Sequence, residues 1–202
     1  MLEIKCFVFG PFETNTYVVS DEQGKALLVD PACLYAHEQQ QLQVYLKDYT
    51  LQAIIATHGH LDHLWGAPWA CNEWSLPVRM HEADIPMAQA MQQQYEFFGI
   101  RAKAQPFPIE PLILSSAYPF ALIHTPGHTP GSICLYWEQE KVLLSGDTLF
   151  HMGYGRTDLP GGDFYQLMDS LDKLFHLPEA TRVYPGHGEH TSLRSTSRNL
   201  LM

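Results

Sequence analysis

The stretch His58-Gly59-His60-Leu61-Asp62-His63 brings four metal-binding side chains into six consecutive positions. It follows an apolar run at 51–57 that is typical of a buried strand, and it leads into 64–74, where apolar residues recur at helical spacing. His58 and His60 stand two apart at the end of a strand, so their imidazoles can leave the same face, while Asp62 and His63 begin the next turn. The pattern therefore predicts that the four side chains converge on one site.

Imidazole and carboxylate groups are ligands for zinc, iron and manganese. Ligands that come from the end of a strand and from the start of a helix approach from two directions, which suits two adjacent metal ions better than one. We therefore expect two divalent metal ions as cofactors, with zinc favoured and iron or manganese as alternatives.

The composition predicts a single domain over residues 1–202. The chain has 202 residues, of which 46% are hydrophobic, so it can bury a full core. Its formal net charge is −10 and its lysines and arginines form no cluster, which disfavours binding to nucleic acid. An anionic substrate would therefore need a local positive group.

Several features favour a soluble, cytoplasmic protein. Residues 1–10 lack the charged, apolar and cleavage regions of a signal peptide, and no apolar run approaches the roughly 20 residues of a membrane helix. The four cysteines show no paired spacing, and three of them lie in apolar strand or helix patterns that predict buried thiols, as in a reducing compartment. We expect a monomer or homodimer without membrane contact.

The order of predicted elements repeats strands followed by a helix in each half of the chain. An antiparallel meander at 3–30 leads through a crossover helix to the strand before His58, and a capped helix beginning at Asp163 follows the strands of the second half. The predicted strands are 3–9, 15–20, 25–30, 51–57, 77–80, 121–125, 132–137, 141–145 and 181–184, the helices are 34–47, 64–74, 82–98 and 163–175, and 104–111 is a loop. This order predicts an α+β fold, a four-layer αβ/βα sandwich in which two sheets face each other.

The second half supplies three more candidate ligands, each just beyond the carboxyl end of a predicted strand. His128 lies in a loop rich in proline and glycine, Asp147 follows Gly146, and His187 follows Gly186. Loops at the end of a rigid sheet commonly present functional groups. Together with the first stretch they make five histidines and two aspartates, enough for two metal ions with Asp147 between them.

The chain resembles the metallo-β-lactamase superfamily and, within it, the glyoxalase II-like hydrolases (hydroxyacylglutathione hydrolases). The segments that carry the resemblance are Asn15 and Tyr17, Val29-Asp30-Pro31, 57–63, 125–131, Gly146-Asp147 and 185–187. The resemblance implies that one metal is bound by His58, His60 and His128, the other by Asp62, His63 and His187, and that Asp147 bridges both. It also implies that Asp30 and Thr57 orient the imidazoles.

The resemblance is to the short bacterial glyoxalase II-like proteins, because the chain ends fifteen residues after His187, where glyoxalase II continues into a helical domain that contacts glutathione. In the longer enzymes a basic residue at the place of Arg156 meets the glutathione carboxylate, so Arg156 is the candidate substrate anchor. True β-lactamases of the zinc-dependent group mostly have cysteine where Asp147 stands, which argues against that activity.

The predicted ligand set favours hydrolysis of a thioester. Two cations that share a water lower its pKa towards 7, so a bridging hydroxide can act as the nucleophile. Asp62 can orient this hydroxide as catalytic residue as well as bind metal. A thiolate, whose reference pKa is about 8.5, leaves without a strong general acid. We expect a small-molecule glutathione thioester such as S-lactoylglutathione as substrate.

Other functions stay open at this stage. Persulfide dioxygenases share the fold but use one iron, held by the counterparts of His58, His128 and Asp147. A metal-binding module without catalysis, a phosphodiesterase and a lactonase are further alternatives, whereas Ser132 and Ser145 lack the turn that exposes a nucleophilic serine. The remaining histidines are expected to be structural at 37, 81 and 176 and are unassigned at 124, 151 and 190.

Overall fold

The computed structural model describes residues 2–113 and 119–200, with side chains described up to 196. Two compact units make up the chain, Met1–Leu112 and Ile113–Met202, and each is described by itself below. No helix within the described ranges is long and apolar enough to cross a membrane.

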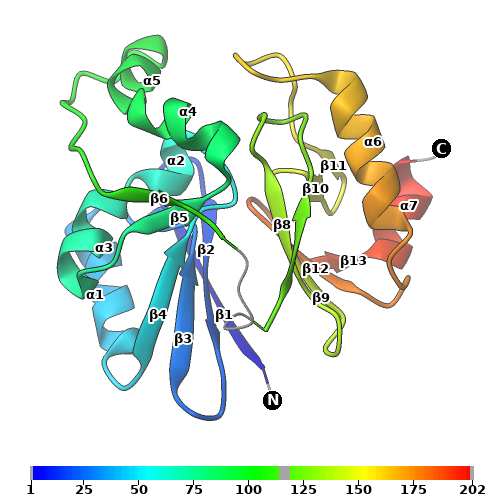
Figure 1. The fold of residues 1–202 in the computed structure, drawn as a ribbon, viewed down its shortest axis with the longest axis horizontal. Coiled ribbons are helices and arrows are strands. Elements are labelled where there is room, and N and C mark those ends of the chain that lie inside the picture. The colour runs from blue at the N-terminus through cyan, green and yellow to red at the C-terminus, as the bar shows by residue number, and fades with distance from the viewer. Residues whose placement is uncertain (1, 114–118, 201–202) are drawn as a thin grey trace. The chain divides into compact units, whose positions relative to one another are not determined.

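The first unit is built on a six-stranded sheet with the strands in the order of the sequence (Figure 1). The strands β1 to β3 pair antiparallel, as the predicted meander requires, and β3 to β6 pair parallel. The strands are β1 Glu3–Phe9, β2 Thr14–Ser20, β3 Lys25–Val29, β4 Thr50–Ile55, β5 Val78–Met80 and β6 Ile109–Pro111. Parallel pairing places the ends of β3 and β4 at the same edge of the sheet, one residue before Asp30 and two residues before Thr57.

Helices of the first unit connect the parallel strands and pack against the sheet. They are α1 Ala36–Leu46, α2 Leu61–Leu64, α3 Ala67–Trp74, the 3-10 helix η1 Glu82–Asp84, α4 Ile85–Gln89 and α5 Met91–Phe97. Leu42 of α1, Ala70 of α3 and Met91 of α5 share one buried cluster with alternate strand residues such as Leu28 and Ile54. This cluster anchors the strand end from which His58 and His60 follow.

The second unit has a five-stranded sheet in the order β13-β12-β9-β8-β7. Only β9 and β12 pair parallel among its described strands, and α6 makes the crossover between them. The elements are β7 Ala121–His124, β8 Ile133–Trp137, β9 Val142–Gly146, β10 Leu149–Phe150, β11 Gly153–Tyr154, α6 Phe164–Phe175, β12 Arg182–Pro185, β13 Thr191–Ser192 and α7 Leu193–Leu200. Figure 1 shows α6 and α7 on the same side of this sheet, and both contribute to one buried cluster.

The predicted helix start at Asp163 is confirmed, because the Asp163 carboxylate accepts the Gln166 N–H at 3.0 Å. Two predicted helices are instead broken. The segment 64–74 divides at Gly66. A Cβ at this position would clash with the Cys33 sulfur, and a proline follows in the first turn of α3. The segment 82–98 divides into η1, α4 and α5: one break precedes Ile85, with Pro86 in the first turn of α4, and the other is at the non-helical Ala90.

Short pairings are the elements that the sequence patterns missed. The predicted loop at 104–111 contains β6, which is three residues long and pairs with β5. The strands β10, β11 and β13 have two residues each, too few for a period to be visible, and α7 follows β13 without a break. These elements exist because neighbouring strands supply their hydrogen bonds.

The cysteines provide a test of burial. Burial raises the pKa of Cys33 to about 12 and the pKa values of Cys71 and Cys134 to about 11. Burial also raises the pKa of Cys6, but Cys6 is the exposed cysteine, on the edge strand β1. We expect iodoacetamide at pH 8 to alkylate only Cys6 in the native protein and all four thiols in urea, as measured by peptide mass spectrometry. Native alkylation of Cys134 as fast as that of Cys6 would contradict the core described here.

Candidate metal centre

Asp30 is the buried carboxylate at the centre of the first unit's candidate site. It follows β3 with a φ of 53°, a left-handed conformation that aspartate tolerates better than most residues. Its Oδ1 accepts the Thr57 N–H at 2.7 Å, and its Oδ2 accepts the Thr57 hydroxyl at 2.8 Å and the His63 Nδ1–H at 2.9 Å. One side chain therefore joins the end of β3, the end of β4 and α2.

These contacts show which ring nitrogen carries the hydrogen in two of the candidate ligands. Because His63 donates from Nδ1 to a carboxylate, its Nε2 is the nitrogen that carries the lone pair. The single hydroxyl hydrogen of Thr57 goes to Asp30, so the 3.1 Å contact between Thr57 Oγ1 and His58 Nδ1 requires the imidazole to donate. His58 therefore also presents Nε2 as an acceptor, as a metal ligand must.

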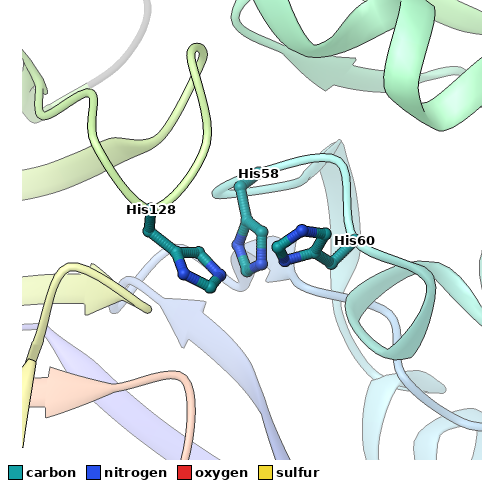
Figure 2. A group of neighbouring side chains, drawn as sticks. All are labelled: His58, His60 and His128. Carbon is teal, nitrogen blue, oxygen red and sulfur yellow. The ribbon is translucent and has the colours of Figure 1, made fainter. Parts of the chain in front are cut away.

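The four predicted ligands of the first unit lie together and are buried. Figure 2 shows His58 and His60 on the turn after β4, with their ring centroids 4.8 Å apart and their planes at 88°. The ring centroids of His58 and His63 are 4.1 Å apart, and His63 Nε2 lies 3.5 Å from Asp62 Oδ2. Thr14, which sequence analysis did not single out, donates its hydroxyl to the same Asp62 oxygen at 3.0 Å.

The three predicted ligands of the second unit also converge. Asp147 follows β9, and its Oδ2 lies 3.6 Å from His128 Nε2 and 3.5 Å from His187 Nε2. His128, labelled in Figure 2 on its loop after β7, donates from Nδ1 to the Arg156 carbonyl at 2.7 Å. His128 therefore shows the same arrangement as His58 and His63, with Nδ1 held by the protein and Nε2 as the acceptor.

The spacing of these atoms fits divalent metal ions. The separations of 3.5–3.6 Å between imidazole nitrogens and carboxylate oxygens are long for hydrogen bonds. They are close to the distance of about 3.4 Å between two ligand atoms bound tetrahedrally at about 2.1 Å to one zinc ion. Neutral imidazole nitrogens and carboxylate oxygens are also the donor set that zinc, iron and manganese accept.

Arg156, the predicted substrate anchor, already has a charged partner. Its Nε and one terminal nitrogen lie 2.7 Å from the two carboxylate oxygens of Asp158, a bidentate pair at the surface. The Arg156 hydrogen bonds lower the pKa of Asp158 to about 2, so the pair is ionised throughout the neutral range. An anionic ligand at Arg156 would have to share the guanidinium with Asp158.

Five of the other six histidines make contacts of their own within their units. His37 stacks on Tyr35, and His81 accepts the Ala83 N–H at the start of η1. His176 bonds the carbonyl of Asp172, and His124 bonds the carbonyl of Pro130. His190 stacks on Tyr184, and His151 follows β10.

Comparison with known proteins identifies the class of this protein: the chain belongs to the metallo-beta-lactamase superfamily, which residues 9–187 match. Hydroxyacylglutathione hydrolase GloC of Haemophilus influenzae is 30% identical over 98% of this chain and 96% of that protein. The crystal structure of TTHA1623 in a di-iron-bound form is 32% identical, with a TM-score of 0.87 over 98% of this chain and 100% of that chain. The crystal structure of BLEG-1, a B3 metallo-beta-lactamase, is 33% identical, with a TM-score of 0.84 over 96% of this chain and 95% of that chain.

The comparisons confirm the predicted α+β fold of the metallo-β-lactamase type. This fold implies divalent metal ions at groups of histidine and aspartate, and the family indicates a metal-dependent hydrolase. The assignment of individual ligands to individual ions stays a prediction.

Gly155 provides a test of the second unit's candidate site. A Cβ at this position would lie 2.0 Å from the Asp147 carbonyl and 2.9 Å from His128 Nδ1, whereas a Cβ at Gly153 would meet nothing within 4 Å. We expect Gly155→Ala to destabilise the protein by about 1–3 kcal/mol, which lowers Tm by several degrees, and to weaken zinc binding. Gly153→Ala is the matched control and should leave both measurements near their wild-type values. Equal behaviour of the two variants would contradict the packing around His128.

Proposed function

We propose that the candidate ligands of the two units form one dinuclear metal centre within a single domain over residues 1–202. Two observations support this proposal: the ligand atoms of each unit converge, and the family match at 9–187 runs across both units. One ion would be held by His58, His60 and His128, the other by Asp62, His63 and His187, with Asp147 shared by both.

The sheet faces opposite the helices support a single domain. In the first unit the apolar residues Tyr17, Val19 and Ile55 alternate along their strands with the residues that pack on the helices. In the second unit Ile133 and Leu135 alternate in the same way with Cys134. A sheet that is apolar on both faces needs cover on both, and a four-layer sandwich provides it.

We propose further that the protein hydrolyses glutathione thioesters of the S-lactoylglutathione type. One observation carries the proposal: imidazole and carboxylate atoms converge at metal-ligand spacing in a chain that matches a hydroxyacylglutathione hydrolase over 98% of its length. Bound metal ions would lower the pKa of a water to about 7 and polarise the thioester carbonyl.

The chain's own residues would complete the reaction. The Thr14 hydroxyl donates to one oxygen of Asp62, which fixes the direction of the carboxylate and lets its acceptor sites orient the attacking water. The departing group is a thiolate, whose reference pKa of about 8.5 makes a general acid unnecessary. The backbone carbonyl of Arg156 holds His128, and its exposed guanidinium would attract the carboxylate of the substrate. Such a positive group is needed because the net charge of the chain is −10.

The direct test is turnover of S-lactoylglutathione by zinc-loaded and iron-loaded protein. We expect hydrolysis with either metal, and we expect Asp62→Ala to lower kcat/KM by about 100-fold or more because it removes both a ligand and the group that orients water. Thr14→Val, which removes only the hydroxyl, should lower it less.

Parallel assays decide between this proposal and other activities of the same fold. Iron-dependent oxygen uptake with glutathione persulfide, without thioester turnover, would replace the hydrolase by the dioxygenase alternative. Turnover of a chromogenic cephalosporin alone would instead favour the activity named for BLEG-1, which is 33% identical to this chain.

The role of Arg156 has its own test. If Arg156 anchors the substrate, Asp158→Asn should lower KM for S-lactoylglutathione several-fold, because it removes the competing carboxylate at 2.7 Å. Arg156→Met should raise KM, with a smaller effect on kcat since the backbone carbonyl that holds His128 remains. Unchanged KM values in both variants would contradict the anchor.

A further inference from the structure

We infer that Gln94 of α5 is a positioning residue that holds the turn 58–61 in the shape that metal binding requires. Its effect on metal binding rests on the function proposed above. The inference itself rests on hydrogen bonds within the first unit, over sequence separations of 33 and 35 residues.

The Gln94 amide bridges the turn and α4. Its Oε1 accepts the Leu61 N–H at 2.9 Å, and its Nε2 donates to the carbonyls of Gly59 and Met87, each at 2.9 Å. These partners determine the orientation of the amide, because one side faces an N–H and the other faces two carbonyls. Both amide hydrogens and the carbonyl oxygen are therefore used.

The turn needs this partner because of how α2 begins. The helix starts at Leu61, and its N-cap, His60, makes no side-chain cap hydrogen bond. The first N–H groups of a helix have no acceptor within the helix, and a serine or aspartate commonly supplies one from the N-cap position. Here the N-cap position carries a candidate metal ligand instead, and Gln94 supplies the acceptor from another helix.

Asp84 holds the same turn from the other side. Its side chain is fully buried, and its Oδ2 accepts the Gly59 N–H at 2.8 Å. Both backbone groups of Gly59 are thus bound, the N–H by Asp84 and the carbonyl by Gln94. A Cβ at Gly59 would lie 3.0 Å from the Asp84 carbonyl and 3.2 Å from the Met87 Cβ, so the turn packs directly on η1 and α4.

His60 is the candidate ligand whose position depends most on Gln94. His58 and His63 have their Nδ1 atoms held by Thr57 and Asp30, whereas the peptide groups on both sides of His60 are held by Gln94. Loss of the Gln94 amide should let the turn and the start of α2 move while the buried cluster of the first unit stays intact. The ion proposed for His58, His60 and His128 should then bind more weakly.

The test compares Gln94→Met, which keeps the length of the side chain, with Gln93→Ala, an exposed neighbour on the same helix. Amide hydrogen exchange of Leu61, measured by NMR on metal-free protein, should be at least about 10-fold faster in Gln94→Met and unchanged in Gln93→Ala. Zinc affinity, measured by chelator competition, should fall about 10- to 100-fold for one of the two ions in Gln94→Met only. The absorption spectrum of the cobalt-substituted protein should change with it.

Unchanged Leu61 exchange in Gln94→Met would overturn the inference, and so would faster exchange with unchanged zinc affinity and cobalt spectrum. If Gln94→Met does not fold, Gln94→Glu decides: it keeps an acceptor for Leu61 but no donor for Gly59, so Leu61 should stay protected while zinc binding weakens. A wild-type protein that binds no zinc would contradict the proposed function. The exchange rate of the Leu61 amide would still decide whether Gln94 holds the turn.

Discussion

The hydrogen bonds of the buried Asp30 carboxylate are the interaction on which the rest of the candidate site depends. A buried carboxylate is costly unless donors surround it, and here a peptide N–H, a hydroxyl and an imidazole do so at 2.7–2.9 Å. The left-handed backbone of Asp30 adds a cost of about 1–3 kcal/mol. It is offset by the Asp30 N–H, which donates to the Ile55 carbonyl at 2.8 Å, and by the Thr16 hydroxyl, which donates to the Asp30 carbonyl at 2.6 Å.

Each unit contains candidate histidines whose Nδ1 atom is held by the protein, which leaves Nε2 as the acceptor. Asp30 holds His63, Thr57 holds His58, and the Arg156 carbonyl holds His128. A carboxylate, a hydroxyl and a backbone carbonyl hold these rings, so the three histidines are oriented before any metal binds. Gln94 and Asp84 extend this support from the rings to the backbone of the turn.

Local patterns predicted most of the strands and pointed to the candidate ligands, because these follow a strand end or, for Asp62 and His63, begin the helix after it. The contacts that hold them were not predictable. Thr14 meets Asp62 across 48 residues, and Gln94 meets Leu61 across 33, and nothing near either residue marks the partner. The partner of Arg156, the proposed substrate anchor, was not predicted either: its guanidinium pairs with Asp158 two residues away, a choice that charge alone does not reveal. The helix break at Gly66 depends on Cys33, a neighbour in space that the local sequence does not reveal. The segment 82–98 has two breaks, and only the one next to Pro86 is marked by a proline, whereas the one at Ala90 is not.

The proposed function requires metal ions that are shared by the donor groups of both units. A crystal structure of the metal-loaded protein, with anomalous data collected at the zinc and iron absorption edges, tests it most directly. We expect two anomalous peaks, one bound by His58, His60 and His128, the other by Asp62, His63 and His187, with Asp147 contacting both. Peaks bound by residues of one unit alone, or no peak at these residues in protein shown to contain metal, would contradict it.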